Sequence, residues 1–179
     1  MRNPLESIIQ NHLQDPTTSI PTEKRCGLVL RYSNLLWKKG GLDSFRISYT
    51  CNALLISIME NHSPKEITKN PRGIEANFIN REEALEAAFA LQKFLIAKDI
   101  PASIVLYVDE GILHENGQWF SSEFYKAEKI ALYSMAHEIR LMSYFQSGFT
   151  APDGIGIFRI KSTQSILFEE ELCTAKDYR

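Results

Sequence analysis

The sequence lacks the features that mark membrane, secreted and disulfide-rich proteins. It has no apolar run of the roughly 18 residues that a membrane-spanning helix needs, and residues 1–14 contain no long apolar core of a signal peptide. Its three cysteines, Cys26, Cys51 and Cys173, are odd in number, widely spaced and without a CxxC pair. That pattern suits reduced thiols rather than a disulfide framework or a zinc motif. We therefore expect a soluble cytoplasmic protein with no membrane partner.

An excess of one charge is also missing. The chain has 20 Lys and Arg residues against 22 Asp and Glu residues, well mixed along its length, and a formal net charge of −2. A protein dedicated to nucleic acid would carry a clustered basic face. We therefore expect no nucleic-acid partner.

No complete catalytic or metal-binding motif is present. The densest group of possible ligands is Asp109-Glu110 with His114-Glu115, and imidazole and carboxylate groups at such spacing can bind a metal. However, HExxH-type spacing is absent, and a solvated strand end beside the Asn-Gly turn that follows explains the group more simply. We expect no metal ion and no cofactor.

The residues that are present fit one packed domain. With 44% hydrophobic and 23% charged residues, the composition lies close to the globular average, and 179 residues suit a single domain. A short helix at Asn3–Gln14 and a proline-containing linker at Asp15–Pro21 precede the apolar run that begins at Cys26. The predicted organisation is an N-terminal helix and linker at residues 1–24 and an α+β domain at residues 25–179.

Apolar spacing predicts the elements of that domain. Strands are expected at Cys26–Tyr32, Glu66–Lys69, Ile74–Phe78, Ala102–Val108, Gly154–Ile160 and Ser165–Leu172. Helices are expected from Asp43 to about Glu60, at Arg81–Lys98, and from Ser121 or Ser122 to about Tyr144. In the first of these helices the expected buried residues are Phe45, Tyr49, Ala53, Ile56 and Met59.

The order of these elements predicts the fold class. Asn70-Pro71-Arg72-Gly73 suits a type I turn, so the strands on either side of it form an antiparallel hairpin. A hairpin inside an alternating series of strands and helices excludes an all-parallel sheet. The sequence therefore predicts a ferredoxin-like α+β sandwich, in which helices pack on a mixed, largely antiparallel sheet.

In the same order, several segments resemble the catalytic domain of class III adenylate and guanylate cyclases. They are Leu30–Leu36, similar to a first strand that ends in a Phe-Ser-Asp-Ile-like run; Gly73–Phe78, similar to the hairpin after a Gly-Asp-Gly turn; Glu83–Gln92, similar to the next helix; Val105–Gly111, similar to a strand that ends in Thr-Gly; and Phe158–Leu172, similar to the final hairpin. The resemblance covers residues 26–172 and implies the cyclase fold and a dimer with shared sites.

The residues that carry cyclase chemistry are replaced in this chain. In the family, two aspartates hold two divalent metals over the triphosphate, and their positions fall on Asn34 and Arg72. An amide binds a hard cation far more weakly than a carboxylate does, and a guanidinium has no lone pair to offer. The transition-state Asn and Arg of the family fall near Lys129 and Tyr133.

The base-reading positions are changed as well. The adenine-reading Lys of the family falls on Thr68, with Lys69 one residue away. Its partner Asp falls on Ser122, with Glu123 next to it. These four residues are candidate ligand-binding residues, and the resemblance implies no catalytic residue in this chain.

Large aromatic residues in and around loops offer a different kind of candidate. Trp37, Trp119 and Phe120 are candidate interface residues, because aromatics are favoured in protein interfaces, although they also form cores. The resemblance implies a catalytically inactive, dimeric regulatory or interaction module, with itself or a cyclase-like protein as partner. Two alternatives stay open: an active cyclase that completes its site with a partner chain, and a nucleotide-binding module without turnover.

Overall fold

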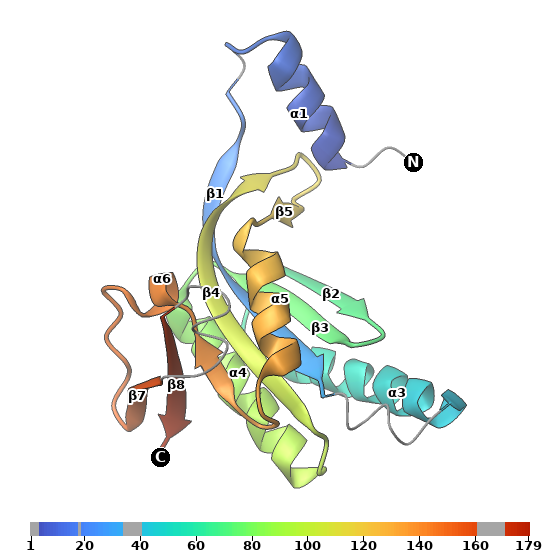
Figure 1. The fold of residues 1–179 in the computed structure, drawn as a ribbon, viewed down its shortest axis with the longest axis vertical. Coiled ribbons are helices and arrows are strands. Elements are labelled where there is room, and N and C mark those ends of the chain that lie inside the picture. The colour runs from blue at the N-terminus through green and yellow to red at the C-terminus, as the bar shows by residue number, and fades with distance from the viewer. Residues whose placement is uncertain (1–3, 18, 34–40, 161–170) are drawn as a thin grey trace.

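The computed structural model describes residues 4–17, 19–33, 41–160 and 171–179. In chain order the elements are α1 (Pro4–Gln14), β1 (Thr22–Tyr32), α3 (Gly41–Glu60), β2 (Glu66–Asn70), β3 (Gly73–Phe78), α4 (Arg81–Ala97), β4 (Ala102–Leu113), β5 (Trp119–Phe120), α5 (Glu123–Tyr133), β6 (Ile139–Leu141), α6 (Ser143–Gln146), β7 (Ile155–Ile160) and β8 (Leu172–Asp177). The described strands form one sheet in the order β2-β3-β1-β4-β6-β8-β7, with β5 paired to β4 (Figure 1).

The centre of the sheet has the predicted ferredoxin-like arrangement. Strand β1 lies between β3 and β4 and runs antiparallel to both, and β2 pairs antiparallel to the outer side of β3. The parallel pairing of β6 with β4 makes the sheet mixed. The prediction of a largely antiparallel α+β sandwich, with Cys26–Tyr32, Ile74–Phe78 and Ala102–Val108 in one sheet, is confirmed.

Alternation along the strands divides the interior into two layers. Leu28 and Leu30 of β1 belong to the larger apolar cluster, which includes buried residues of α3 and α4. Val29, between them, belongs to a second cluster with Val105 of β4 and Ala127 of α5. Successive side chains of a strand point to opposite faces, so α5 covers the sheet face opposite to α3 and α4. This second face positions the candidate site.

The long helix predicted from Ser121 or Ser122 to Tyr144 is wrong in its second half. Helix α5 begins at Glu123 after Ser122 and ends at Tyr133. His137 then takes a left-handed backbone conformation, with φ 65°, and β6 follows. Pairing of β6 with the central strand β4 buries Ile139 and Leu141. Burial in the sheet therefore outweighs the helical propensity of this segment.

The buried face predicted for α3 is also largely wrong. Ala53 is exposed, as are Phe45 and Tyr49, Ile56 is half-buried, and only Met59 of the expected set is fully buried. The buried face instead contains Ser48, Cys51, Asn52, Leu55 and Met59. Ser48 donates to the carbonyl of Pro71 over 2.6 Å, and Asn52 donates to the carbonyl of Asn70 over 2.9 Å. These polar contacts with the β2–β3 turn set the rotation of the helix.

The remaining differences concern the ends of elements. Strand β1 begins at Thr22, so the predicted boundary at residue 24 falls inside it. The strand predicted at Ser165–Leu172 lies mostly outside the described residues, and the described strand β8 begins at Leu172. The extended β1 and β4 form a ribbon that leads away from the sheet toward α1 (Figure 1). In the described part of the chain, no helix has both the length and the apolar character needed to cross a membrane.

Candidate functional site

A buried arginine lies at the end of β1, on the sheet face that α5 covers. The side chain of Arg31 is 0% exposed. It forms an ion pair with Glu75 of β3 and another with Glu128 of α5, at 2.7 Å. The Arg31 Nε atom donates to the same Glu128 oxygen over 3.0 Å. The guanidinium carbon lies 5.9 Å from the centre of the Phe124 ring. A buried charge is tolerated when it is paired in this way.

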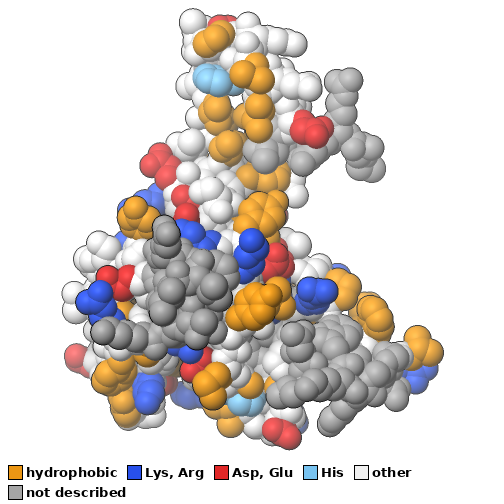
Figure 2. Space-filling model, in the orientation of Figure 1, with side chains coloured by type: hydrophobic (Ala, Val, Ile, Leu, Met, Phe, Trp, Pro, Cys, Tyr) orange, Lys and Arg blue, Asp and Glu red, His pale blue; other side chains and the backbone are white. Residues whose placement is uncertain are grey.

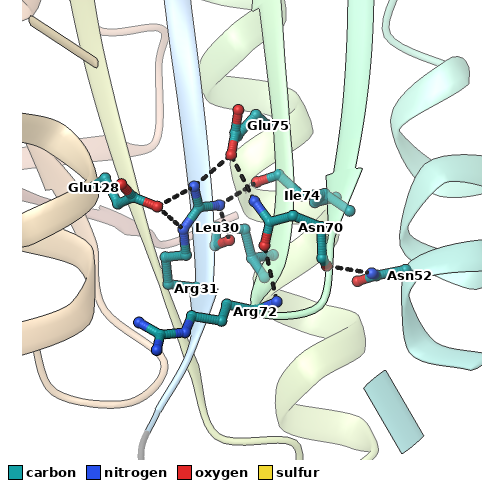
Figure 3. Close-up of polar contacts among 8 residues, drawn as sticks. All are labelled: Leu30, Arg31, Asn52, Asn70, Arg72, Ile74, Glu75 and Glu128. Carbon is teal, nitrogen blue, oxygen red and sulfur yellow. Dashed lines mark hydrogen bonds and ion pairs between the residues drawn. The ribbon is translucent and has the colours of Figure 1, made fainter. Parts of the chain in front are cut away.

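The remaining Arg31 donors are used by the backbone. Its Nη1 group donates to the carbonyls of Leu30, at 3.1 Å, and Ile74, at 3.4 Å. All five N–H groups of the guanidinium therefore have partners, as Figure 3 shows together with the residues around them. We call Arg31, Glu75, Glu128 and Asn70 the Arg31 network.

Asn70 connects the network to the β2–β3 turn. Its side-chain nitrogen donates to Glu75 over 2.7 Å, and its side-chain oxygen accepts from the backbone N–H of Arg72 over 2.8 Å. Asn52 of α3 donates to the Asn70 carbonyl and accepts from the hydroxyl of Tyr32 over 2.7 Å. The network thus ties α5, β1, β3 and α3 together around one end of the sheet.

The position implied for the second metal-binding aspartate lies in this turn. Arg72 is exposed, and its side chain runs from the turn across β1 toward α5 (Figure 3). Its carbonyl accepts from the backbone N–H of Tyr32 over 2.9 Å. The next residue, Gly73, has φ 147°, and a Cβ there would lie 2.0 Å from the carbonyl oxygen of Leu30. Glycine therefore lets the turn approach β1 closely, which places the Arg72 backbone beside the Arg31 network.

The other implied catalytic positions lie elsewhere. Asn34, the position of the first aspartate, lies outside the described residues. Lys129 and Tyr133, the transition-state positions, are both exposed on α5. Residues four apart on a helix share a face, so Tyr125, Lys129 and Tyr133 form one outward-facing stripe. We call these three residues the α5 stripe.

An aromatic cavity of about 300 Å³ lies next to the Arg31 network. Its aromatic lining consists of Tyr107, Trp119, Phe120, Phe124 and Tyr125, and its polar side chains are Glu66, Thr68, Glu75, Asn77, Gln118 and Ser121. Burial raises the pKa of the Tyr107 phenol, so this group stays protonated. The described lining contains two carboxylates and neither lysine nor arginine.

The structure separates the four candidate ligand-binding residues. Thr68 lines the aromatic cavity. Lys69, its neighbour on β2, faces the opposite side of the sheet, where its Nζ atom lies 5.8 Å from the centre of the Tyr49 ring on α3. The pleat of the strand causes this separation. Lys69 is therefore placed away from the cavity that Thr68 lines.

Ser122 and Glu123 form hydrogen bonds at the start of α5. The side chain of Asp109 accepts from the Ser121 hydroxyl at 2.7 Å, the Ser122 hydroxyl at 3.1 Å and the Glu123 backbone N–H at 3.2 Å. Burial acts to raise the pKa of Asp109, but these hydrogen bonds together hold it below its ordinary value. The Glu123 side chain pairs with Lys126 at 3.0 Å. Among the described residues, no group of three His, Cys, Asp or Glu side chains could hold a metal ion.

The predicted interface aromatics are placed as follows. Trp37 lies outside the described residues. Trp119 is 9% exposed, stacks on Tyr107 with ring centres 6.1 Å apart, and donates to the carbonyl of Glu23 over 2.8 Å. Its ring is therefore part of the core and offers little surface to a partner. Phe120 is half-buried at the aromatic cavity.

Sequence reasoning missed the Arg31 network. One signal for it was present, because Arg31 is the only charged residue in the otherwise apolar segment Leu28–Tyr32. A charge inside a central strand requires buried partners. The partners Glu75 and Glu128 are distant in sequence and gave no signal of their own.

Comparisons with known proteins address the fold. No protein-family model matches the chain, and no curated protein matches it. Among solved structures, an adenylate/guanylate cyclase/hydrolase from Silicibacter pomeroyi is 14% identical, with a TM-score of 0.65 over 87% of this chain and 96% of that chain. The catalytic core of a rhodopsin-guanylyl cyclase with converted specificity, in complex with ATPalphaS, is 8% identical, with a TM-score of 0.70 over 88% and 98%.

A third structure agrees with these two. The adenylyl cyclase CyaB from P. aeruginosa is 12% identical, with a TM-score of 0.64 over 89% of this chain and 97% of that chain. The chain therefore has the fold of class III adenylate and guanylate cyclase catalytic domains, as its sequence resemblance implied. At such low identity the likeness shows the fold alone.

Proposed function

We propose that this chain, whose fold is that of class III nucleotide cyclase catalytic domains, is a catalytically inactive domain that acts as a regulatory or interaction module. The observation that carries the proposal is the Arg31 network. In an active cyclase, this end of the sheet must present anionic groups to metal ions. Here two carboxylates at this end of the sheet, Glu75 and Glu128, both form ion pairs with a buried guanidinium that belongs to the chain itself.

Electrostatics near the β2–β3 turn supports the same proposal. Two-metal phosphoryl chemistry needs ligands that hold both ions and stabilise the attacking and leaving oxygens. By the family resemblance, Arg72 brings a positive charge to the position of one such ligand, and Arg31 is buried on the neighbouring strand. Neither guanidinium can donate a lone pair to a metal. The Lys129 and Tyr133 positions, on the outer face of α5, also lack the amide and guanidinium that assist the family's transition state.

A turnover assay tests this proposal. The purified full chain is incubated with ATP or GTP and manganese, beside an active class III cyclase as positive control. Losing one group that stabilises the transition state costs on the order of 10²–10³ in rate, so the loss of several should leave no detectable cyclic product. The variant Asn34→Asp/Arg72→Asp should also stay inactive, because the Arg31 network, Lys129 and Tyr133 remain. Robust cyclic product that a point substitution in this chain abolishes would overturn the proposal.

Exposed apolar side chains support the interaction role. Tyr125 and Tyr133 of the α5 stripe are 69% and 66% exposed, and Figure 2 shows hydrophobic and basic side chains alternating over α5. Aromatic side chains are enriched in protein interfaces. The family resemblance implies a dimer, and closed twofold dimers are the commonest homo-oligomers. We propose a symmetric homodimer in which the α5 stripe contacts the partner subunit.

A further inference from the structure

We propose that the aromatic cavity is a binding site for a small organic cation, of the class of arylalkylamines. The inference goes beyond the proposed function and does not depend on whether the domain turns over a nucleotide. It rests on three features of the cavity: its aromatic walls, the sign of its charge, and the way in which the chain already binds a cation at its edge.

The walls and the size suit a ring-bearing ligand. A volume of about 300 Å³ lies at the lower end of the range for small-molecule sites. The rings of Tyr107 and Trp119 stack against each other, and those of Phe124 and Tyr125 meet edge to face with centres 5.4 Å apart. Tyr107 and Trp119 are buried and stacked, so a ligand meets a preformed aromatic surface on that side.

The charge of the cavity selects a cation. Its described lining contains Glu66 and Glu75 but no basic side chain. The charge of Glu75 is already balanced by Arg31. Within the described part of the chain, the Oε2 atom of Glu66 accepts one neutral hydrogen bond, from the Asn77 amide at 3.2 Å, and has no cationic partner. Glu66 is therefore the carboxylate left to balance a positive ligand, and an anionic triphosphate would be repelled from this lining.

The two arginines nearest the cavity do not change this sign. Arg25 is buried, pairs with Glu23 and donates to the side-chain oxygen of Asn77 over 2.8 Å. Arg31 is enclosed by its own network. Each is matched by at least one carboxylate, so neither leaves a positive charge for an anion.

The chain itself contains the same kind of contact. The Arg31 guanidinium lies over Phe124, 5.9 Å from the ring centre, and pairs with Glu75. Phe124 and Glu75 also line the aromatic cavity. Aromatic faces attract cations most strongly where water is excluded. A ligand ammonium inside the cavity, between Glu66 and the neighbouring rings, would likewise be held by one carboxylate and an aromatic face.

Calorimetry with a matched pair of probes tests the site. Tyramine carries a phenol ring and an ammonium group, and tyrosol replaces the ammonium with a hydroxyl. Each is titrated into the full chain at pH 7, and ATP is titrated separately. We expect tyramine to bind roughly tenfold more tightly than tyrosol, and ATP to bind less tightly than tyramine.

Two substitutions in the cavity and one outside it complete the test. Glu66→Gln keeps an acceptor for Asn77 but removes the charge, and should weaken tyramine binding roughly tenfold without changing tyrosol binding. Phe120→Leu should also weaken tyramine binding, because it removes an aromatic face from the cavity. Glu60→Gln, at the exposed end of α3, should have no effect. Equal binding of the two probes, no tyramine binding at millimolar concentration, unchanged binding by Glu66→Gln, or tighter binding of ATP would each overturn the inference.

Discussion

At the scale of single residues, we expect that replacing the buried Arg31 lowers the stability of the fold. Arg31→Met would leave the Glu75 and Glu128 carboxylates without their buried countercharge. Breaking a buried pair from one side typically costs about 3–5 kcal/mol, and we expect a loss of that order in the free energy of unfolding, measured by urea denaturation at pH 7. The variant Arg31→Met/Glu75→Gln/Glu128→Gln should recover most of it, because no isolated charge remains.

The matched control for that substitution is an exposed pair. Arg159 and Glu171 form an ion pair at 3.0 Å, with side chains 71% and 46% exposed. Such pairs contribute about 0–1 kcal/mol, so Arg159→Met should change stability little. A small effect of Arg31→Met, similar to that of the control, would contradict the role given to the Arg31 network.

Asp109 gives a prediction that depends on pH. Asp109→Asn should destabilise the chain by roughly 1 kcal/mol at pH 7, because hydrogen bonds to a charged acceptor are stronger than those to a neutral one. The folded-state pKa of Asp109 is depressed. Its contribution is therefore complete above the unfolded-state pKa, about 3.9, and is lost as the pH falls through the folded-state pKa.

The measurement compares urea unfolding of the two proteins at several pH values from 7 down to about 3. The difference in unfolding free energy should stay constant near neutrality and shrink in the acid range. Asp153→Asn, at an exposed turn position, should show no such trend. A difference between wild type and Asp109→Asn that grows toward acid pH would contradict the assignment.

Features of the candidate site could be predicted from the sequence only where residues adjacent in the chain determine them. The proposal that Arg72 replaces a metal-binding aspartate depends on one residue in one turn, so it can be made from the sequence alone. The opposite orientations of Thr68 and Lys69 follow from strand alternation, once the strand is known. The Arg31 network was not predictable, since it joins residues of β1, β3 and α5 that only the folded sheet brings together.

At the scale of elements, the α5 stripe predicts self-association. The double substitution Tyr125→Ser/Tyr133→Ser should weaken a dimer, because buried aromatic anchors often dominate an interface. The matched control is Tyr144→Ser on α6, since Tyr144 is exposed to a similar degree, 67%. Light scattering at tens of micromolar should report a dimer for the wild type and the control, and a larger monomer fraction for the double variant. A wild-type monomer at that concentration would contradict the prediction.

The elements themselves were predicted unevenly. Helix α4 matched its prediction because Asn80 caps it, accepting from the Glu83 N–H over 2.9 Å, and its apolar spacing is regular. The predicted helix extended beyond the end of α5 because the segment 134–141 contains neither glycine nor proline. The local sequence therefore has no helix stop signal. The parallel pairing of β6 with β4, a long-range contact, decides that segment instead.

At the scale of the whole molecule, fold and chemistry are specified by different residues. The cyclase fold follows from element order and from alternating apolar positions such as Leu28, Leu30 and Ile104, which many hydrophobic residues can satisfy. This explains how solved cyclases of 8–14% identity share the topology. In the family the chemistry depends on a few charged positions, and we propose that Arg72 replaces one of them in this chain.

The most direct test of that central claim is a calorimetric titration with a non-hydrolysable ATP analogue, with and without manganese. A site that used two metal ions would bind the analogue much more tightly when manganese is present. Because the resemblance implies that Arg72, a guanidinium without a lone pair, replaces one of the two metal-binding carboxylates, we predict that manganese does not strengthen binding of the analogue to this chain. An increase in affinity of tenfold or more with manganese would contradict the account.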